Sequence, residues 1–443
     1  MRKVLFVILT LSFLCLNAKE NITIYNDNFA LVRSQFDIQL SKGMQNYIYD
    51  DIPSQIETNS LVFKNQDNKL MLISQNYEYD LAGTNAILNK YLNKQIDITM
   101  RDKSRYSGIL TFFVGDSYGI QDNETKEMHL INKSEIMYIN LPELPGNFYI
   151  KPSLKWQIDA PKAGQYPLDI SYITNAIDWF VTYNVVLNPD KMEVSPWVTI
   201  NNQSGKSYKD ISLKLMAGDL NKEEYEYEEG IEEICTIKKS VMKDPAFEEK
   251  AFADYHLYTL DQNVSINENQ IKQMALFDTK IVDYERFYDY TSFNEEVISK
   301  VKFKNSEQTG LGLPLPKGIV MMYLKDKNDN LVLVDEDDIA HTALDQEVEL
   351  SRGNAFDIIA KTTLIKSTQF NHGADHELSI VIENNKNEDI ELRIQHIFYY
   401  DNTQIISKNF DYTEKDAYSI YINRRIKAGT TDSLFWTQRE KYN

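Results

Sequence analysis

Residues 376–398, HELSIVIENNKNEDIELRIQHIF, contain two runs in which apolar and polar side chains alternate. The apolar positions are Leu378, Ile380 and Ile382 in the first run and Ile390, Leu392 and Ile394 in the second. A period of two is typical of a β-strand with one buried and one solvated face, and the polar Asn-Asn-Lys-Asn-Glu stretch between the runs is typical of a turn. The segment therefore predicts a hairpin of two antiparallel strands.

The same signature extends over the whole chain of 443 residues, which is rich in tyrosine and phenylalanine. Turn residues such as Asn, Asp and Gly recur roughly every eight to twelve residues, and long segments of helical period are scarce. A second clear alternation, Ile211, Leu213 and Leu215, follows the turn NNQSGKSYKD. These patterns predict an all-β protein.

The first eighteen residues have the composition of an export signal. Arg2 and Lys3 precede a nearly continuous apolar run, which ends close to the small residue Ala18. That apolar core is too short to span a bilayer, and bulky residues precede Cys15 where a lipoprotein signal needs small ones. We therefore expect residues 1–18 to be a signal peptide and the mature protein to be periplasmic or secreted.

Charge and cysteine content narrow the classes of partner. The chain has a net charge of -19, and removal of the signal would leave Cys235 as the only cysteine, so no internal disulfide is expected. An acidic chain without a basic patch is repelled by nucleic acid and by anionic lipid headgroups. No later apolar run is long enough to cross a membrane. We expect protein or glycan partners in the cell envelope, no nucleic acid and no transmembrane segment in the mature chain; the oligomeric state stays open.

The organisation along the chain predicts three parts. Residues 19–80 read as an amino-terminal β-domain, and residues 81–145 read as a small β-barrel preceded by a short helix, with Thr84 as its amino-terminal cap. About five short strands in this second part resemble Sm-like and SH3-like barrels. A proline-rich passage marks the next boundary, and residues 146–443 read as a large β-sandwich-like region. Its interruption at 221–250 is charged and predicts a helical or loop insertion.

Several ordered blocks resemble a bacterial family, the domain of unknown function 4139. The blocks are SYITNAIDWFVTYNVVLN, VTINNQSGKSYKDISLKLMAGDLN, GLGLPLPKGIVMMYLKD, DEDDIAHTALDQEVELSRGNAFDI and VIENNKNEDIELRI. The positions that match the opening motif are Trp179, Tyr183, Asn202, Gly205, Gly218 and Asp219. The resemblance covers about residues 165–440, and ITIYNDNFALV near the start is similar to the region that usually accompanies this domain. The resemblance implies no assigned activity.

The block GLGLPLPKGIVMMYLKD, residues 310–326, first suggests a loop that cradles phosphate. A dinucleotide fingerprint needs a third glycine at position 315, which is Leu315, and a helix after the loop. Pro314 and Pro316 disrupt a helix, and the following residues 319–324 read as a strand. We expect a rigid entry into that strand and no cofactor.

Two parts of the sequence contain candidate metal ligands. Asp326, Asn328, Asn330 and Asp337 have a calcium-loop spacing, but Leu331 stands where the loop needs glycine, so a hairpin turn fits better. The residues NHGADH bring His372 and His376 close in sequence, and His341 follows the acidic run 335–338 earlier in the chain. The candidate ligands for calcium or zinc are Asp335, Asp337, Asp338, His341, His372 and His376.

The sequence shows no catalytic motif. It contains no Gly-x-Ser-x-Gly elbow, and its sixty-six acidic residues make paired carboxylates uninformative. Trp156, Trp179, Trp197 and Trp436 are expected to pack in sheet cores rather than line a glycan surface. We expect a non-enzymatic binding or scaffold module of the cell envelope. The alternatives are an envelope hydrolase of glycan or peptide, metal-dependent or not, and recruitment of a partner or oligomerisation by the 221–250 segment.

Overall fold

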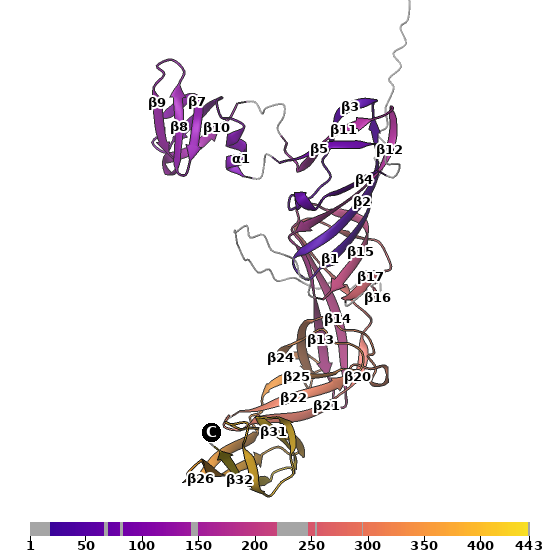
Figure 1. Cartoon of the computed structure of the whole chain (residues 1–443), viewed down its shortest axis with the longest axis vertical. Coiled ribbons are helices and arrows are strands. Elements are labelled where there is room, and N and C mark those ends of the chain that lie inside the picture. Colours follow the sequence, from indigo (N-terminus) through magenta and orange to yellow (C-terminus); the bar gives the residue numbers. More distant parts are fainter. Residues whose placement is uncertain are drawn as a thin grey trace, which may run out of the picture.

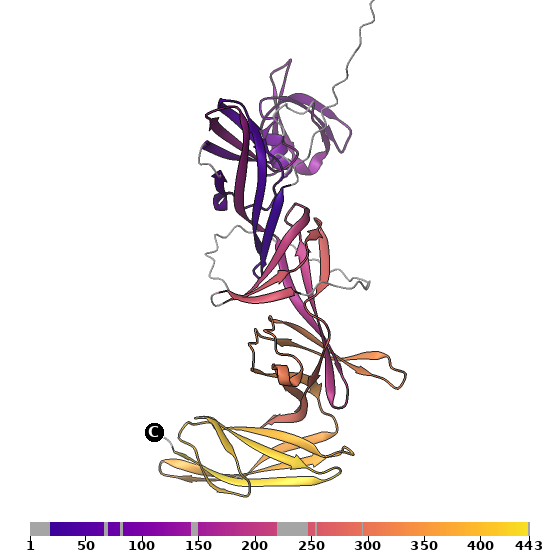
Figure 2. The same ribbon diagram turned by 90° about the vertical axis from the view of Figure 1, so that its right-hand side faces the viewer.

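The computed structural model describes residues 18–65, 70–79, 83–142, 149–218, 247–252, 255–294 and 296–441. Strands make up nearly all of the regular structure in this part of the chain, so the expected all-β class is confirmed. The sheets follow one another along an elongated molecule (Figures 1 and 2). No helix among the described residues is long and apolar enough to cross a membrane. The predicted signal peptide, apart from Ala18, lies outside the described residues.

The upper end of the elongated molecule, as drawn in Figure 1, contains a large twisted sheet and a short sheet. The large sheet has the order β16 (Phe247–Phe252), β17 (Tyr255–Leu260), β15 (Tyr208–Ala217), β1 (Lys19–Tyr25), β2 (Phe29–Leu40), β12 (Gly164–Asn175) and β4 (Val62–Asn65), and β18 (Val264–Ile266) pairs with β15. The short sheet has the order β3 (Gly43–Tyr49), β11 (Ser153–Ala160) and β5 (Met71–Glu78). Strands from 19–80 and from 146–443 therefore share both sheets, and the predicted boundary between these parts does not separate them.

A middle sheet lies below the large sheet in Figure 1. Its order is β19 (Gln270–Ala275), β14 (Lys191–Asn202), β13 (Ile177–Leu187), β23 (Gly318–Lys325) and β24 (Leu331–Ile339), and β20 (Lys280–Asp283) pairs with β14. The upper and middle sheets share one hydrophobic core, in which Trp156 and Trp179 are fully buried. The predicted strand 319–324 lies within β23, and Asp326 closes the turn to β24 by accepting backbone hydrogen bonds from Asn328 and Asn330.

A small domain, residues 83–142, lies beside the upper end of the elongated molecule (Figure 1). After helix α1 (Thr84–Asn89), residues 83–142 form a sheet with the order β10 (Ile136–Asn140), β6 (Gln95–Met100), β7 (Arg105–Val114), β8 (Ser117–Asp122) and β9 (Met128–Asn132). The predicted strands are present, but no closed barrel forms within these residues, because β9 and β10 end the sheet order without pairing to each other. Gly83, not Thr84, occupies the cap position of α1, and no side chain caps it.

A two-sheet sandwich forms the lower end of the molecule. Its first sheet has the order β25 (Glu347–Asn354), β22 (Val297–Lys304), β21 (Glu285–Thr291), β28 (Ile390–Ile397), β31 (Ser419–Ile426) and β30 (Thr413–Asp416). Its second sheet has the order β26 (Ile358–Phe370), β27 (Gly373–Asn384), β32 (Thr431–Lys441) and β29 (Gln404–Lys408). A separate core, which includes Trp436, fills the space between them. Short 3-10 turns η1 (Thr58–Ser60), η2 (Lys133–Glu135) and η3 (Glu307–Thr309) complete the elements.

The segment 376–398 forms two strands as predicted, but it does not form a hairpin. β27 pairs with β26 and β32, whereas β28 pairs with β21 and β31, so the two strands belong to opposite sheets. The polar residues between them form an arch from one sheet to the other. The predicted alternation is correct, because Leu378, Ile380 and Leu392 all face the sandwich core.

The charged insertion falls mostly outside the described residues. Residues 219–246 are not described, and β16 begins at Phe247, where the insertion was expected to continue as a helix or loop. Cys235 lies outside the described residues as well.

Candidate functional site

A cleft opens at one end of the sandwich, between the second sheet and the loops that follow β21 and β28. We call it the sandwich cleft. Its volume is about 380 Å³, which falls within the range of roughly 300–1,000 Å³ that is usual for small-ligand sites. It is lined by Phe293, Leu364, His376, Leu378, Ile397, Phe398, Tyr399, Gln438 and Glu440. Strands β26, β27 and β32 supply one side, and residues just past β21 and β28 supply the other.

The walls of the sandwich cleft are apolar and exposed at the rim. Tyr399 is 81% exposed and Phe293 is 62% exposed, while Leu364 and Ile397 are each about half exposed. Large apolar side chains gathered around a concavity are typical of an interaction site, since single exposed apolar residues need no explanation but a contiguous group does.

A chain of polar contacts runs along the floor of the cleft into the core. His396 Nδ1 lies 2.9 Å from Ser292 Oγ, and His396 Nε2 lies 2.8 Å from Gln438 Oε1. Gln438 Nε2 donates to Glu440 Oε1 at 3.1 Å, and Glu440 Oε2 lies 3.4 Å from His376 Nε2. We call Ser292, His396, Gln438, Glu440 and His376 the polar chain. It connects a buried histidine to the cleft.

The hydrogen bonds assign the protonation of His396. Gln438 Oε1 also accepts from Trp436 Nε1 at 3.2 Å, so it acts as the acceptor for an Nε2–H of His396. Nδ1 is then the acceptor for the Ser292 hydroxyl. Burial lowers the pKa of His396 to about 4, and the bond to Gln438 opposes this only in part. The imidazole is therefore neutral at neutral pH.

Strand β26 forms an edge of the second sheet beside the cleft. Among the described residues it pairs with β27 alone. The amide of Thr362 donates to the hydroxyl of Tyr290 and so points away from β27. Because outward and inward backbone groups alternate along an antiparallel strand, Leu364 also turns its amide and carbonyl outward. The amide and carbonyl groups of Leu364, which lines the cleft, are therefore directed away from β27.

The structure does not gather the six predicted metal ligands. Asp335, Asp337 and Asp338 belong to β24, His341 follows that strand, and His372 and His376 belong to the sandwich. No group of three or more His, Cys, Asp or Glu side chains in the described part of the chain is placed to hold a metal ion. Asp337 accepts from the amide of Ser351 at 2.6 Å, and His341 Nδ1 accepts from the amide of Lys317 at 3.1 Å. Of the six, His376 alone lines the sandwich cleft.

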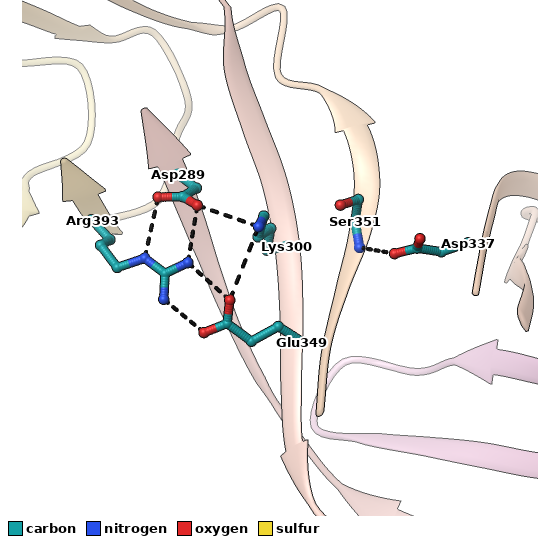
Figure 3. A network of polar contacts seen from close by, with 6 residues as sticks. All are labelled: Asp289, Lys300, Asp337, Glu349, Ser351 and Arg393. Carbon is teal, nitrogen blue, oxygen red and sulfur yellow. Dashed lines mark hydrogen bonds and ion pairs between the residues drawn. The ribbon is translucent and has the colours of Figure 1, made fainter. Parts of the chain in front are cut away.

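An ion network covers the outer face of the first sandwich sheet (Figure 3). Arg393 Nη2 lies 2.9 Å from Asp289 Oδ2, and Arg393 Nη1 lies 2.6 Å from Glu349 Oε1. Lys300 approaches the same Asp289 carboxylate to 3.3 Å, and the ring of Phe287 stacks on the guanidinium. The two cations and two anions neutralise one another, so this network stabilises the sheet and leaves no unpaired charge for a ligand.

The ion network shifts the pKa values of its members. Burial alone would raise the pKa of Asp289, but the hydrogen bonds and charge of Arg393 outweigh it and lower the value. The same guanidinium lowers the pKa of Glu349, and the two carboxylates raise the pKa of Arg393.

A second paired charge is buried at the start of β1. Lys206 Nζ lies 2.8 Å from Glu20 Oε1 and 3.0 Å from Asp51 Oδ2, and it donates to the carbonyl of Asp51. The Asn202 side chain holds the turn that presents this lysine by donating to the carbonyls of Lys206 and Asn267. A cavity of about 720 Å³ adjoins the pair. Because every donor of the ammonium meets an oxygen, the pair is structural.

Sequence reasoning missed all of the polar chain except His376. Its members are spread from Ser292 to Glu440, and no local motif joins them. The comparisons add no functional residue: no family model matches the chain, and no curated protein matches it.

Proposed function

We propose that the protein is an exported, non-enzymatic binding module of the cell envelope, and that the sandwich cleft with the edge of β26 binds an extended peptide segment of a partner. One observation carries the proposal. β26 is a strand of 13 residues whose outward backbone lies directly beside an apolar cleft.

Strand addition explains why these two features lie together. An extended peptide that pairs with a sheet edge gains affinity from main-chain hydrogen bonds and specificity from pockets that receive every second side chain. Leu364 both lines the cleft and presents outward backbone groups, so a peptide paired there places a neighbouring side chain in the cleft. An apolar side chain suits the walls formed by Phe293, Leu378 and Phe398.

Localisation and family membership are part of this proposal. The basic and apolar start of the chain supports export to the periplasm or the medium. The ordered motif blocks support membership of the domain of unknown function 4139 family, which remains a prediction. A binding role does not depend on that membership.

The geometry of Ser292 and His396 does not favour the hydrolase alternative. Their 2.9 Å contact has the reach of a nucleophile and its base. The third group is the neutral amide of Gln438, which cannot stabilise an imidazolium as a carboxylate does. The depressed pKa of His396 makes it a weak base, and Ser292 is buried. The polar chain therefore fits a structural role.

The test is a binding measurement with a defined probe. A short fluorescent peptide of alternating threonine and valine, with a central phenylalanine and a lysine at each end, is titrated with the protein and followed by anisotropy. We expect saturable binding that Leu364→Asp abolishes, because a carboxylate at this position desolvates in the apolar cleft.

Ile359→Asp is the matched control. Ile359 lies on the same strand, is also 49% exposed like Leu364, and faces the opposite side of the sheet. The substitution Ile359→Asp should leave peptide binding unchanged. Absence of saturable binding, or equal loss in both variants, would refute the proposal.

A further inference from the structure

A buried carboxylate lies at the floor of the sandwich cleft. Glu440 lines the cleft on the side of β32, although this residue is only 7% exposed. A carboxylate is seldom buried unless a cation pairs with it. Within the described part of the chain, its one ion-pair contact is with His376 Nε2 at 3.4 Å. A protonated imidazole and a carboxylate meet at about 2.7–2.9 Å, so this contact does not supply Glu440 with a close cation.

The other groups around Glu440 are neutral or point elsewhere. The amide of Gln438 donates to Glu440 Oε1 without adding charge, and His396 beyond it is neutral at neutral pH. Arg439 turns to the opposite face of the sheet, where its Nε lies 2.7 Å from Asp375 Oδ1. None of the described residues that line the cleft is a lysine or an arginine. The floor therefore carries a negative charge that a cationic ligand can neutralise.

Aromatic rings form part of the cleft walls. Phe293, Phe398 and Tyr399 all line the cleft. The faces of aromatic rings attract cations, and their area also binds the apolar part of a ligand. Phe293 has a φ of +68°, which is rare for a bulky residue, and it is 62% exposed at the rim. A backbone held in such a conformation is common at ligand-binding sites, and here it keeps an aromatic side chain out of the core.

We propose that the sandwich cleft binds a small organic ammonium ion that carries an apolar group, an arylalkylamine being the simplest example. The ammonium group pairs with Glu440, and the apolar group contacts the aromatic walls. The cleft volume of about 380 Å³ lies near the lower end of the usual range of roughly 300–1,000 Å³, which suits a ligand of this size.

The ligand is a free amine and not a side chain of the peptide proposed above. Leu364 on β26 and Glu440 on β32 are separated by β27, so the two residues lie about 10 Å or more apart across the sheet. A strand added outside β26 lies one spacing farther still, and its side chains do not reach the carboxylate. Binding of the amine needs no strand at β26 and therefore goes beyond the proposed function.

The experiment compares four probes by isothermal titration calorimetry: 2-phenylethylamine, 2-phenylethanol, ethylamine and 3-phenylpropanoate. The alcohol keeps the ring without the charge, ethylamine keeps the charge without the ring, and the propanoate reverses the charge. We expect 2-phenylethylamine to bind most tightly, by at least about tenfold over the alcohol, since charged hydrogen bonds are stronger than neutral ones. Equal binding of the amine and the alcohol, or no measurable binding of the amine, would overturn the inference.

Glu440→Gln tests the carboxylate, because glutamine keeps the size of the side chain and removes its charge. The variant should bind 2-phenylethylamine about tenfold more weakly and bind 2-phenylethanol as the wild type does. Glu377→Gln is the matched control, because Glu377 is exposed on neighbouring β27 and lies on the opposite face of the sheet. Equal weakening by both substitutions would attribute the preference to overall charge and contradict a site at Glu440. An unchanged preference for the amine in Glu440→Gln would contradict it as well.

Tyr399→Ala supplies a test that does not alter a buried residue. Tyr399 is 81% exposed, so its truncation leaves the sandwich core intact. We expect 2-phenylethylamine to bind about threefold more weakly, because the ligand loses its contact with this ring. Tyr138→Ala, at an exposed position of the small domain, should leave the affinity unchanged. Wild-type affinity in Tyr399→Ala would contradict an aromatic wall around the ammonium ion.

The two proposals for the cleft can fail separately. Saturable binding of the threonine–valine peptide without binding of the amine refutes the ammonium site and leaves the proposed function standing. Binding of the amine that Glu440→Gln weakens, without binding of the peptide, refutes the proposed function and supports the ammonium site.

Discussion

Gly205 shows how one residue ties a motif of the sequence to the packing of distant segments. Its φ of +88° lies in the left-handed region, and an added Cβ would fall 2.0 Å from Ser54 Oγ. The turn docks there through a hydrogen bond from the amide of Gln55 to the carbonyl of Ser204. The Asn-x-x-Gly pattern noted in the sequence is therefore a structural turn.

Replacing Gly205 by alanine should destabilise the protein more than the same change at Gly43. Both residues have a positive φ, which costs alanine about 1 kcal/mol, but the space around Gly43 is open. We expect Gly205→Ala to lower the free energy of unfolding by about 2 kcal/mol more than Gly43→Ala, measured by urea denaturation. Equal losses would show that the contact with Ser54 relaxes without cost.

His396 predicts an acid-sensitive sandwich. Its folded pKa of about 4 lies below the ordinary value of 6.5, so the folded state resists protonation. Its stabilising contribution is complete above pH 6.5 and is lost as the pH falls toward 4, by at most about 3 kcal/mol. We expect the loss of unfolding free energy between pH 7 and pH 4.5 to be smaller in His396→Gln than in the wild type.

The comparison for His396 uses the slope with pH rather than the stability at one pH, because the substitution also alters packing. His372→Gln, at an exposed turn, is the control and should keep the wild-type slope. An unchanged slope in His396→Gln would contradict the prediction.

At the scale of the element, the ion network joins neighbouring strands of the first sandwich sheet. Arg393 on β28, Asp289 on β21, Lys300 on β22 and Glu349 on β25 connect adjacent strands across one face (Figure 3). Most of these side chains are largely shielded from water, so their pairing is stronger than that of an exposed ion pair.

Arg393→Met should lower the free energy of unfolding by about 3 kcal/mol at neutral pH, since it leaves two carboxylates to share Lys300. The pKa values of Asp289 and Glu349 are lowered in the folded state, so the network stabilises above their ordinary values near pH 4 and its contribution is lost as the pH falls below them. The difference in unfolding free energy between the wild type and Arg393→Met, measured by chemical denaturation, should become smaller below about pH 4.

Arg425→Met is the control for the network. Arg425 is 69% exposed and forms a looser pair with Asp389 at 3.4 Å, so its loss should cost less than about 1 kcal/mol. A comparable loss in both variants would mean that the network adds nothing beyond a surface ion pair.

The strands also show which structural features could be predicted from the sequence and which could not. Alternation in residues 376–398 correctly predicted which side chains are buried, because a period of two determines the face of a strand. It did not determine the strand's partner, and nearness in sequence wrongly suggested a hairpin. For the same reason the polar chain could not be predicted. Ser292, His396 and Gln438 meet only because the residue after β21 packs against β28 and β32, which come from separate parts of the chain.

At the scale of the whole molecule, the described residues contain three hydrophobic cores. One fills the upper and middle sheets, one fills the sandwich, and one lies in the small domain around Leu110 and Ile120. The core of the small domain contains residues of that domain alone, whereas the core of the upper and middle sheets also includes Val301 and Val348 from the first sandwich sheet. The small domain is therefore expected to unfold in a step of its own.

Ile120→Ala tests this independence. Removing a fully buried isoleucine should cost about 2–5 kcal/mol within the small domain. In scanning calorimetry we expect one transition to move to lower temperature while the others stay, and Ile380→Ala in the sandwich core should move a different one. A shift of every transition by Ile120→Ala would show that the cores unfold together.

The arch between β27 and β28 affects the order in which the strands of the sandwich can pair during folding. β27 forms a hairpin with β26, the strand before it, but its second partner is the distant β32, where Leu378 lies opposite Trp436. β28 pairs with the distant β21, where Arg393 lies opposite Asp289. Strand pairings this distant in sequence form slowly. During synthesis the two sheets of the sandwich cannot both be completed until β32 has emerged. Until then β27 lacks one of its two partner strands, so a chain truncated before β32 is expected to leave the second sandwich sheet incomplete.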